Sequence, residues 1–165
     1  MSAAEKILIL NRGDAEVAIP RSWTVKPDPA GFVKIEDSSE NCLLELSCMR
    51  LPPLSADAPT AAGRLGAVLP EKAEIIAEDR GDLRLAWADY AYEADDTQKG
   101  LRRPARGRWL IAENGRIQAL ATFYYWADDA AWAVPAWERI VATLRLGFGE
   151  QLKGPHEHWS LRDPE

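Results

Sequence analysis

Apolar and polar residues alternate with a period of two over much of the chain, which is the pattern of β-strands with one buried face. In the first third, short alternating runs occupy 7–10, 15–20 and 32–36, and turn-forming residues such as those at 11–14 separate them. A longer run at 42–51 is apolar on both faces, which predicts a central strand with a cover on each side. The first third is therefore expected to consist of strands.

The chain from 105 to 126 predicts a β-hairpin. The dipeptide Asn114-Gly115 lies between two long apolar runs, and this is a strong signal for a hairpin with a two-residue loop. Such a loop, centred on this dipeptide, places Trp109 opposite Leu120. Both faces of the hairpin are apolar, so each face of the sheet needs a cover. Further strands are predicted at 73–79 and 83–94.

Two segments have the apolar spacing of helices. The first is predicted at 59–69, with Asp57 as its N-terminal cap. In the second, Pro135 is expected to separate a short turn at 129–134 from a helix at 135–144, because proline removes a helical hydrogen bond. The order of strands and helices predicts an α+β fold, with a mostly antiparallel sheet flanked by an internal helix and a C-terminal helix.

Composition and charge narrow the class of protein. The 165 residues are 47% hydrophobic and 28% charged, which is typical of a globular domain, and we expect one domain at 1–146 with a tail at 147–165. The net charge of -6 argues against nucleic-acid binding. The apolar runs are shorter than the ~20 residues that span a bilayer, and the first ten residues lack the long apolar stretch of a secretory signal. We therefore expect a cytoplasmic protein that binds neither nucleic acid nor membrane.

Two short patterns resemble the PsbP-like fold superfamily. An apolar stretch that leads into Ile19-Pro20-Arg21-Ser22-Trp23 resembles the strand, proline and tryptophan that open this fold. The segment 140–146 resembles the end of its last helix. The superfamily includes PsbP, a nuclear-import factor that binds the GTPase Ran, DcrB-like proteins and Eag-type secretion chaperones. The resemblance implies an α/β/α sandwich in a binding or accessory protein, and it carries over no functional residue.

The residues that most often carry catalysis or metal binding are scarce. Cys42 and Cys48 fall on one face of the predicted strand, about 20 Å apart, so we expect two buried, unbridged thiols. His156 and His158 share a face of an extended segment, but a third metal ligand is not evident, so a polar tail is favoured over a metal site. Hydrolase, nucleotide-binding and dinucleotide-binding motifs are absent from the sequence. We expect no enzyme activity and no cofactor.

A basic stretch gives one candidate site. Guanidinium groups suit anions, so the stretch is a candidate anion patch. Acidic residues at 93–96 precede it, and if the two strands pair, the opposite charges neutralise each other. The basic side chains of the patch are Arg102, Arg103, Arg106 and Arg108.

An excess of large aromatic residues in the second half gives the other candidate. Such side chains usually fill the core, but Tyr and Trp also dominate recognition surfaces, and both interpretations remain open. The candidate binding surface comprises Trp87, Tyr90, Tyr92, Trp109, Tyr124 and Trp126.

Together these observations favour a non-enzymatic, cytoplasmic bacterial binding or accessory protein. It would act through contacts with another protein, or with a second copy of itself as a homodimer. The alternative is a small-molecule carrier with an apolar cavity between the sheet and the C-terminal helix, behind Trp109 and Tyr124.

Overall fold

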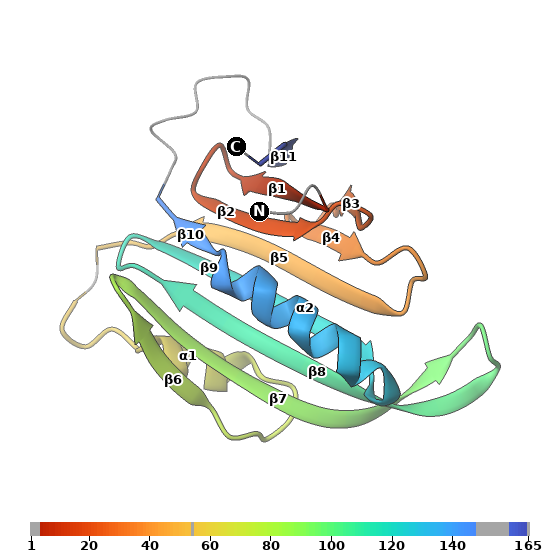
Figure 1. The fold of residues 1–165 in the computed structure, drawn as a ribbon. Coiled ribbons are helices and arrows are strands. Elements are labelled where there is room, and N and C mark those ends of the chain that lie inside the picture. The colour runs from red at the N-terminus through yellow and green to blue at the C-terminus, as the bar shows by residue number, and fades with distance from the viewer. Residues whose placement is uncertain (1–3, 54, 148–158, 165) are drawn as a thin grey trace.

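The computed structural model describes residues 4–53, 55–147 and 159–164, which form two β-sheets and two α-helices (Figure 1). All the strand pairs are antiparallel. The larger sheet has seven strands in the order β3 (Thr24–Pro27), β4 (Val33–Glu36), β5 (Cys42–Arg50), β9 (Ile117–Trp126), β8 (Leu101–Glu113), β7 (Leu83–Asp96) and β6 (Ile76–Arg80). The smaller sheet has four, in the order β10 (Arg145–Leu146), β2 (Ala15–Pro20), β1 (Glu5–Leu10) and β11 (Trp159–Arg162).

The two helices lie on opposite faces of the larger sheet (Figure 1). Helix α2 (Ala130–Ala142), which follows the 3-10 turn η1 (Ala127–Asp129), packs on one face together with the smaller sheet. Helix α1 (Ala61–Val68) packs on the other. We call these the α2 face and the α1 face. The layered arrangement confirms the predicted α+β fold with a sheet between two helices.

The α2 face carries the main hydrophobic core. Phe123 of β9 is fully buried there and stacks on Trp137 of α2, with ring centroids 5.5 Å apart. Trp23, the tryptophan of the Pro-x-x-Trp pattern, also stacks on Phe123, with ring centroids 6.4 Å apart. Leu8 and Ile19 of the smaller sheet join the same cluster. The smaller sheet and α2 thus cover this face together. That β1 and β2 form a separate sheet was not predicted from the sequence.

The α1 face is covered over a smaller area. Leu65 of α1 is fully buried against Ala86, Ala88 and Ile111. An eight-residue helix is about 12 Å long, so it reaches only part of the long strands β7 and β8. The cap is Thr60, whose Oγ1 accepts a hydrogen bond from the Gly63 amide at 3.1 Å. The prediction of Asp57 as cap is therefore wrong.

The hairpin between β8 and β9 is present, but its predicted register is wrong by two residues. Trp109 pairs with Thr122 rather than with Leu120. The central residues of the turn are Gly115 and Arg116, not Asn114 and Gly115: the Asn114 amide donates to the Ile117 carbonyl oxygen at 3.2 Å. Gly115 has φ +88°, and a glycine at the first central position is typical of a type II′ turn. Because side chains alternate between the two faces of a strand, a register shift of two residues leaves every side chain on its predicted face.

The C-terminal helix begins earlier than predicted. It is one helix from Ala130 to Ala142, and Pro135 lies inside it rather than at its start. Pro135 and Ala131, the residue whose carbonyl oxygen loses its helical partner, both lie on the exposed side. Water can therefore hydrate that carbonyl group, so the helix tolerates the proline.

Both ends of the described chain meet in the smaller sheet. Strand β11, in the segment that the sequence set apart as a tail, pairs with β1, and Ile7 lies opposite Arg162. Cys42 and Cys48 of β5 are both free thiols, as predicted, although Cys48 is only half-buried. No helix within the described ranges has both the length and the apolar character needed to cross a membrane.

Candidate functional site

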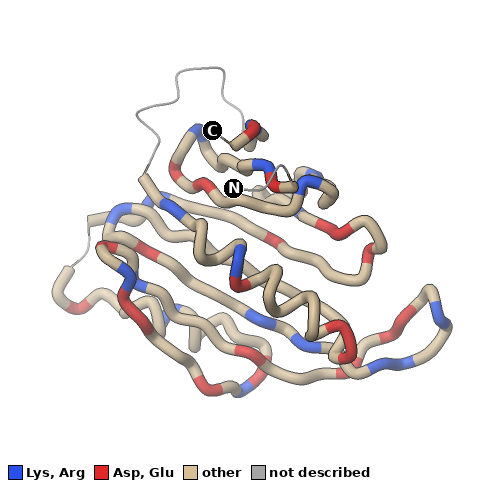
Figure 2. Tube along the Cα trace, in the orientation of Figure 1, with Lys and Arg blue, Asp and Glu red and all other residues tan. Residues whose placement is uncertain are grey.

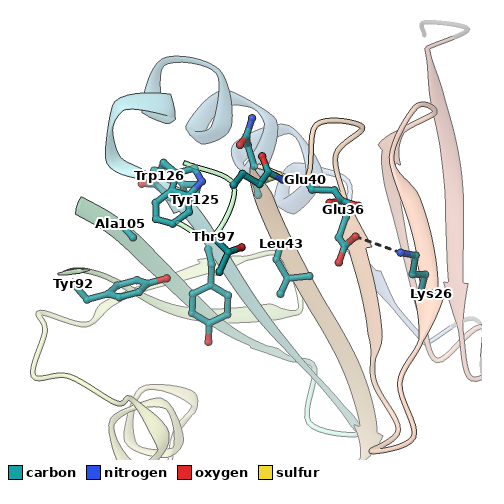
Figure 3. Close-up of a pocket in the computed structure, with 13 residues that line it drawn as sticks. Lys26, Glu36, Glu40, Leu43, Tyr92, Thr97, Ala105, Tyr125 and Trp126 are labelled. Carbon is teal, nitrogen blue, oxygen red and sulfur yellow. Dashed lines mark ion pairs between the residues drawn. The ribbon is translucent and has the colours of Figure 1, made fainter. Parts of the chain in front are cut away.

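The part of the α1 face that α1 leaves uncovered contains a hollow of about 460 Å³ (Figure 3). It lies near the turn between β7 and β8, and its aromatic wall consists of three half-buried rings. These belong to Tyr92, Tyr124 and Trp126. Ala105 lies between Tyr92 and Trp126 on the sheet surface, and Leu43 lies beside Tyr124. The lining is completed by Lys26, Glu36, Glu40, Asn41, Cys42, Thr97, Gln98 and Tyr125.

The strand register brings these rings together. Tyr92 on β7 and Trp126 on β9 both lie opposite Ala105 of β8, so a small residue separates two large ones. Tyr124 lies opposite Leu43 of β5. The rings of Tyr92 and Tyr124 meet edge to face, with centroids 6.3 Å apart. Burial, and then the neighbouring Tyr124, raise the pKa of Tyr92, so its hydroxyl group stays neutral at physiological pH.

The rim of the hollow is polar, and a rigid turn holds part of it. Asp37 is buried, and its carboxylate accepts hydrogen bonds from the backbone amides of Asn41 at 2.7 Å and Cys42 at 2.9 Å. Burial alone would raise the pKa of Asp37, but these bonds and those from Ser39 hold that pKa below its usual value. The turn places Glu40, with φ +56°, at the rim.

Charged pairs hold two other parts of the wall. Lys26 and Glu36 form an ion pair at 3.6 Å across β3 and β4 (Figure 3). On the opposite side, the Arg103 guanidinium lies 4.5 Å from the centre of the Trp126 ring. Arg103 is fixed by ion pairs with Asp96 at 2.6 Å and Asp128 at 2.8 Å. Its hydrogen bond lowers the pKa of Asp96, so the pair stays charged at neutral pH.

The structure divides the predicted aromatic surface into three groups. Tyr92, Tyr124 and Trp126 line the hollow. Tyr90 and Trp109 lie on the same face but are covered: Tyr90 is buried with its ring over Gly107, and Trp109 packs against the cluster under α1. The sixth residue belongs to the α2 face. This is Trp87, which contacts the Arg108 guanidinium at 5.1 Å.

Each arginine of the predicted anion patch is paired with a carboxylate. Arg102 contacts both Glu93 and Asp95 at 3.4 Å. Arg106 and Arg108 both contact the carboxylate of Asp89. Positive and negative residues face each other along the β7–β8 hairpin (Figure 2). The neutralisation that the sequence suggested is therefore present.

The other chemical candidates do not form a site. The described residues hold no group of His, Cys, Asp and Glu that could bind a metal ion, and His156 and His158 lie outside them. Burial raises the pKa of the Cys48 thiol to about 12, so this thiol is not a reactive nucleophile at neutral pH. The carrier alternative placed a cavity between the sheet and α2. Stacked rings of Phe123 and Trp137 fill part of that space, and a hollow of about 270 Å³ between the sheet and α2 is lined by Trp87, Leu110 and Trp137. The hollow beside Tyr124 lies on the opposite face.

Sequence reasoning missed the polar half of the hollow. Lys26, Glu36 and Glu40 come from short strands and a turn far from β9 in the sequence. In the sequence, the polar segment 37–41 only separates the predicted strands at 32–36 and 42–51. These polar residues lie near the aromatic rings because β4 pairs with β5 and β5 pairs with β9. The sequence does not specify these pairings.

Solved structures share this fold. The solution structure of cyanobacterial PsbP (CyanoP) from Synechocystis sp. PCC 6803 aligns with a TM-score of 0.59 and 14% identity, over 89% of this chain and 95% of that chain. A crystal structure from Bacteroides thetaiotaomicron aligns with a TM-score of 0.63 and 17% identity, over 93% of this chain, which spans only 52% of that chain. LpqN of Mycobacterium tuberculosis, involved in cell envelope biogenesis, aligns with a TM-score of 0.51 and 12% identity, over 80% of this chain and 82% of its own. The PsbP-like fold is thus confirmed.

Sequence comparison gives the family. The protein alr1449 of Nostoc sp. (strain PCC 7120) is 30% identical over an alignment of 153 residues, and the match covers 87% of this chain and 78% of that protein. The model of the Alr1449 family matches residues 6–149, which include the aromatic residues of the hollow. The chain therefore belongs to the Alr1449 family, and it has a PsbP-like fold.

Proposed function

We propose that the protein is a non-enzymatic binding protein of the bacterial cytoplasm that holds a segment of another protein in the aromatic hollow. The observation that carries this proposal is the half-buried position of Tyr92, Tyr124 and Trp126 around one concave site. Tyrosine and tryptophan contribute most to binding energy when they line a pocket that a partner can desolvate. Elsewhere on this face, α1 covers the aromatic residue Trp109.

The chemistry of the hollow favours a partner segment with a lysine or arginine side chain. The aliphatic stem of such a side chain would lie on the rings of Tyr92 and Tyr124, and its charged group would reach the carboxylate of Glu40 at the rim. Cation–π contacts of this kind already occur within the protein, as at Trp126. The net charge of -6 also favours the approach of a basic partner.

A site-specific crosslink identifies the partner. A photoreactive phenylalanine analogue in place of Leu43, inside the hollow, is expected to crosslink one protein in the native host. The same analogue in place of Val68, an exposed residue of α1, is the matched control and is expected not to crosslink that protein. The identified partner is then purified, and its affinity for the chain is measured by isothermal titration calorimetry.

The affinity measurements decide the proposal. Tyr124→Ala and Glu40→Lys are each expected to weaken binding at least ~10-fold, which corresponds to about 1.4 kcal/mol. Trp132→Ala removes an exposed aromatic side chain outside the hollow and is expected to leave the affinity unchanged. Equal affinities for the wild type and Tyr124→Ala would exclude the hollow as the binding site. A native-host small molecule that co-purifies with the wild type but not with Tyr124→Ala would instead support a carrier.

A further inference from the structure

The aromatic rings of the hollow lie on different sides of it. The rings of Tyr92 and Tyr124 are almost perpendicular, at 89°, with centroids 6.3 Å apart. Trp126 lies across the sheet from Tyr92, because both residues pair with Ala105 of the strand between them. Figure 3 shows Tyr92 and Trp126 apart, with Ala105 between them. A group that enters the hollow can therefore contact aromatic surface from more than one direction.

A small residue forms the floor between two of these rings. Ala105 lies opposite both Tyr92 and Trp126, so a single methyl group occupies the position where a larger side chain would fill the space. The volume of about 460 Å³ falls within the range of ligand pockets. The hollow therefore accommodates a whole long side chain together with part of its main chain.

The charges of the lining leave one carboxylate unpaired. Three charged side chains line the hollow, and they belong to Lys26, Glu36 and Glu40. Lys26 and Glu36 form an ion pair at 3.6 Å, whereas Glu40 has no ion-pair partner among the described residues. The guanidinium on Trp126 belongs to Arg103, which is already paired with two carboxylates. The lining therefore has a surplus negative charge, which favours a ligand with a positive charge.

An unmodified ammonium group suits only the rim of this hollow. It has three N–H donors and is strongly hydrated, so it needs oxygen acceptors in place of the water that it loses. The carboxylate of Glu40 supplies such acceptors at the rim, but the faces of the aromatic rings do not. A trimethylated ammonium group has no N–H donor, and its methyl groups can pack against ring faces while the charge is attracted to them. The aromatic part of the hollow therefore suits a quaternary ammonium group better than an unmodified one.

We propose that the partner segment carries an N-trimethylated lysine, and that Tyr92, Tyr124 and Trp126 hold its quaternary ammonium group. This inference rests on the proposed function, which places a basic side chain of a protein segment in the same hollow. The carboxylate of Glu40 balances the charge without donating or accepting a hydrogen bond. The chain already holds a weakly hydrated cation on the same aromatic surface, because the Arg103 guanidinium lies 4.5 Å from the centre of the Trp126 ring.

Three short peptides separate the effects of methylation, charge and shape. Each is an N-acetylated, C-amidated tripeptide with glycine on both sides of one central residue. The central residue is trimethyllysine, lysine, or the neutral analogue of trimethyllysine in which carbon replaces the quaternary nitrogen. NMR titrations of the full chain measure binding through the indole N–H signal of Trp126, and the signal of Trp132, outside the hollow, is the internal control. The trimethyllysine peptide is expected to bind at least ~10-fold more tightly than either of the others.

Matched variants test the rings and the carboxylate separately. Tyr124→Leu keeps an apolar side chain but removes the ring, so it is expected to reduce the preference for trimethyllysine over its neutral analogue at least ~5-fold. Tyr124→Phe keeps the ring and is expected to retain the preference. Glu40→Gln is expected to weaken binding of the trimethyllysine peptide and to leave the neutral analogue unaffected. Trp132→Leu, outside the hollow, is the control for all three, and circular dichroism verifies that each variant is folded.

The outcomes separate this inference from the proposed function. A lysine peptide or a neutral analogue that binds as tightly as the trimethyllysine peptide would overturn the inference, whereas the affinity of Tyr124→Ala for the crosslinked partner still decides the proposed function. Choline chloride is expected to bind more weakly than the trimethyllysine peptide, because it lacks the lysine stem and the main chain. Choline that binds as tightly would assign the hollow to a free small molecule and overturn the trimethyllysine. An unchanged Trp126 signal with all the compounds would also overturn the inference.

Discussion

The two faces of the larger sheet use aromatic residues from the same strand in different ways. Phe123 and Tyr124 are adjacent on β9 and point to opposite faces. On the α2 face, Phe123 is fully buried and stacks with both Trp137 and Trp23. On the α1 face, Tyr124 stays half-exposed at the wall of a hollow. The difference lies in the covering element: a helix and a second sheet cover one face, and a helix of eight residues covers the other.

The largest effect is expected on the covered face. Phe123→Ala leaves a cavity between stacked rings and is expected to lower the free energy of unfolding by about 3–5 kcal/mol. Urea denaturation at neutral pH measures the loss. Phe123→Leu, which keeps most of the volume, is expected to lose clearly less. A loss below ~1 kcal/mol for Phe123→Ala would mean that this face is not the main core.

The next effect concerns the rim of the hollow. Asp37→Ala leaves the buried amide of Cys42 and the part-buried amides of Ser39 and Asn41 unpaired, and it is expected to cost about 3 kcal/mol at neutral pH, since a hydrogen bond to a charged group contributes ~1.5–3 kcal/mol. Asp37→Asn is the milder variant, because an amide oxygen can accept some of the same bonds. Urea denaturation at neutral pH compares both with the wild type.

The pH dependence of this effect has a definite sign. The pKa of Asp37 is lower in the folded protein than in the unfolded chain, so its stabilisation is fully present above the unfolded value of about 3.9. It is lost as the pH falls through the folded-state pKa. The stability difference between the wild type and Asp37→Ala is therefore expected to shrink at acid pH. A difference that is constant from neutral to acid pH would contradict the role of the carboxylate.

A smaller loss of folding stability is expected from Gly107→Ala, which lies in the covered part of the α1 face. A Cβ atom at Gly107 would lie 2.5 Å from Cζ of the buried Tyr90 ring, so the ring must move. The expected cost is about 1–3 kcal/mol. Gly63→Ala is the matched control, since its Cβ meets only ordinary contacts in α1, and it is expected to stabilise the protein by up to ~1 kcal/mol. Thermal unfolding of both variants tests whether the signs are opposite.

The smallest effect on stability is expected in the hollow itself. Tyr124→Ala removes a half-exposed ring that no helix covers, so the free energy of unfolding is expected to fall by ~1 kcal/mol or less. Urea denaturation in parallel with Phe123→Ala gives the comparison directly. Equal losses in the free energy of unfolding for the two variants would show that both rings belong to the core. That result would argue against the hollow as a binding site.

Much of the fold could be predicted from the alternation of residues, because alternation assigns side chains to faces. The faces of β7, β8 and β9 follow the predicted pattern, including Trp87 on one side and Tyr92 on the other. The register of the β8–β9 hairpin could not be predicted in the same way, because Asn114-Gly115-Arg116 offers two positions for a two-residue turn. The bonds from the Arg116 and Ile117 amides to Asn114 Oδ1 accompany the position that the chain adopts.

The site could be predicted only in part, because a covering element decides whether an aromatic residue is core or surface. The sequence identified Tyr92, Tyr124 and Trp126, but it grouped them with Tyr90 and Trp109, which are covered. It also could not predict that the first two strands leave the larger sheet. That division depends on β10 and β11 pairing with them from the far end of the chain.

The pairing of β1 with β11 also affects how the protein is made. The ribosome synthesises β1 early and its partner strand β11 much later, so the pair in which Ile7 lies opposite Arg162 can form only after most of the residues between them have been made. Until then, one edge of β1 is open to any other nascent strand. The closing step joins residues far apart in the sequence, so it is expected to be among the slowest in folding.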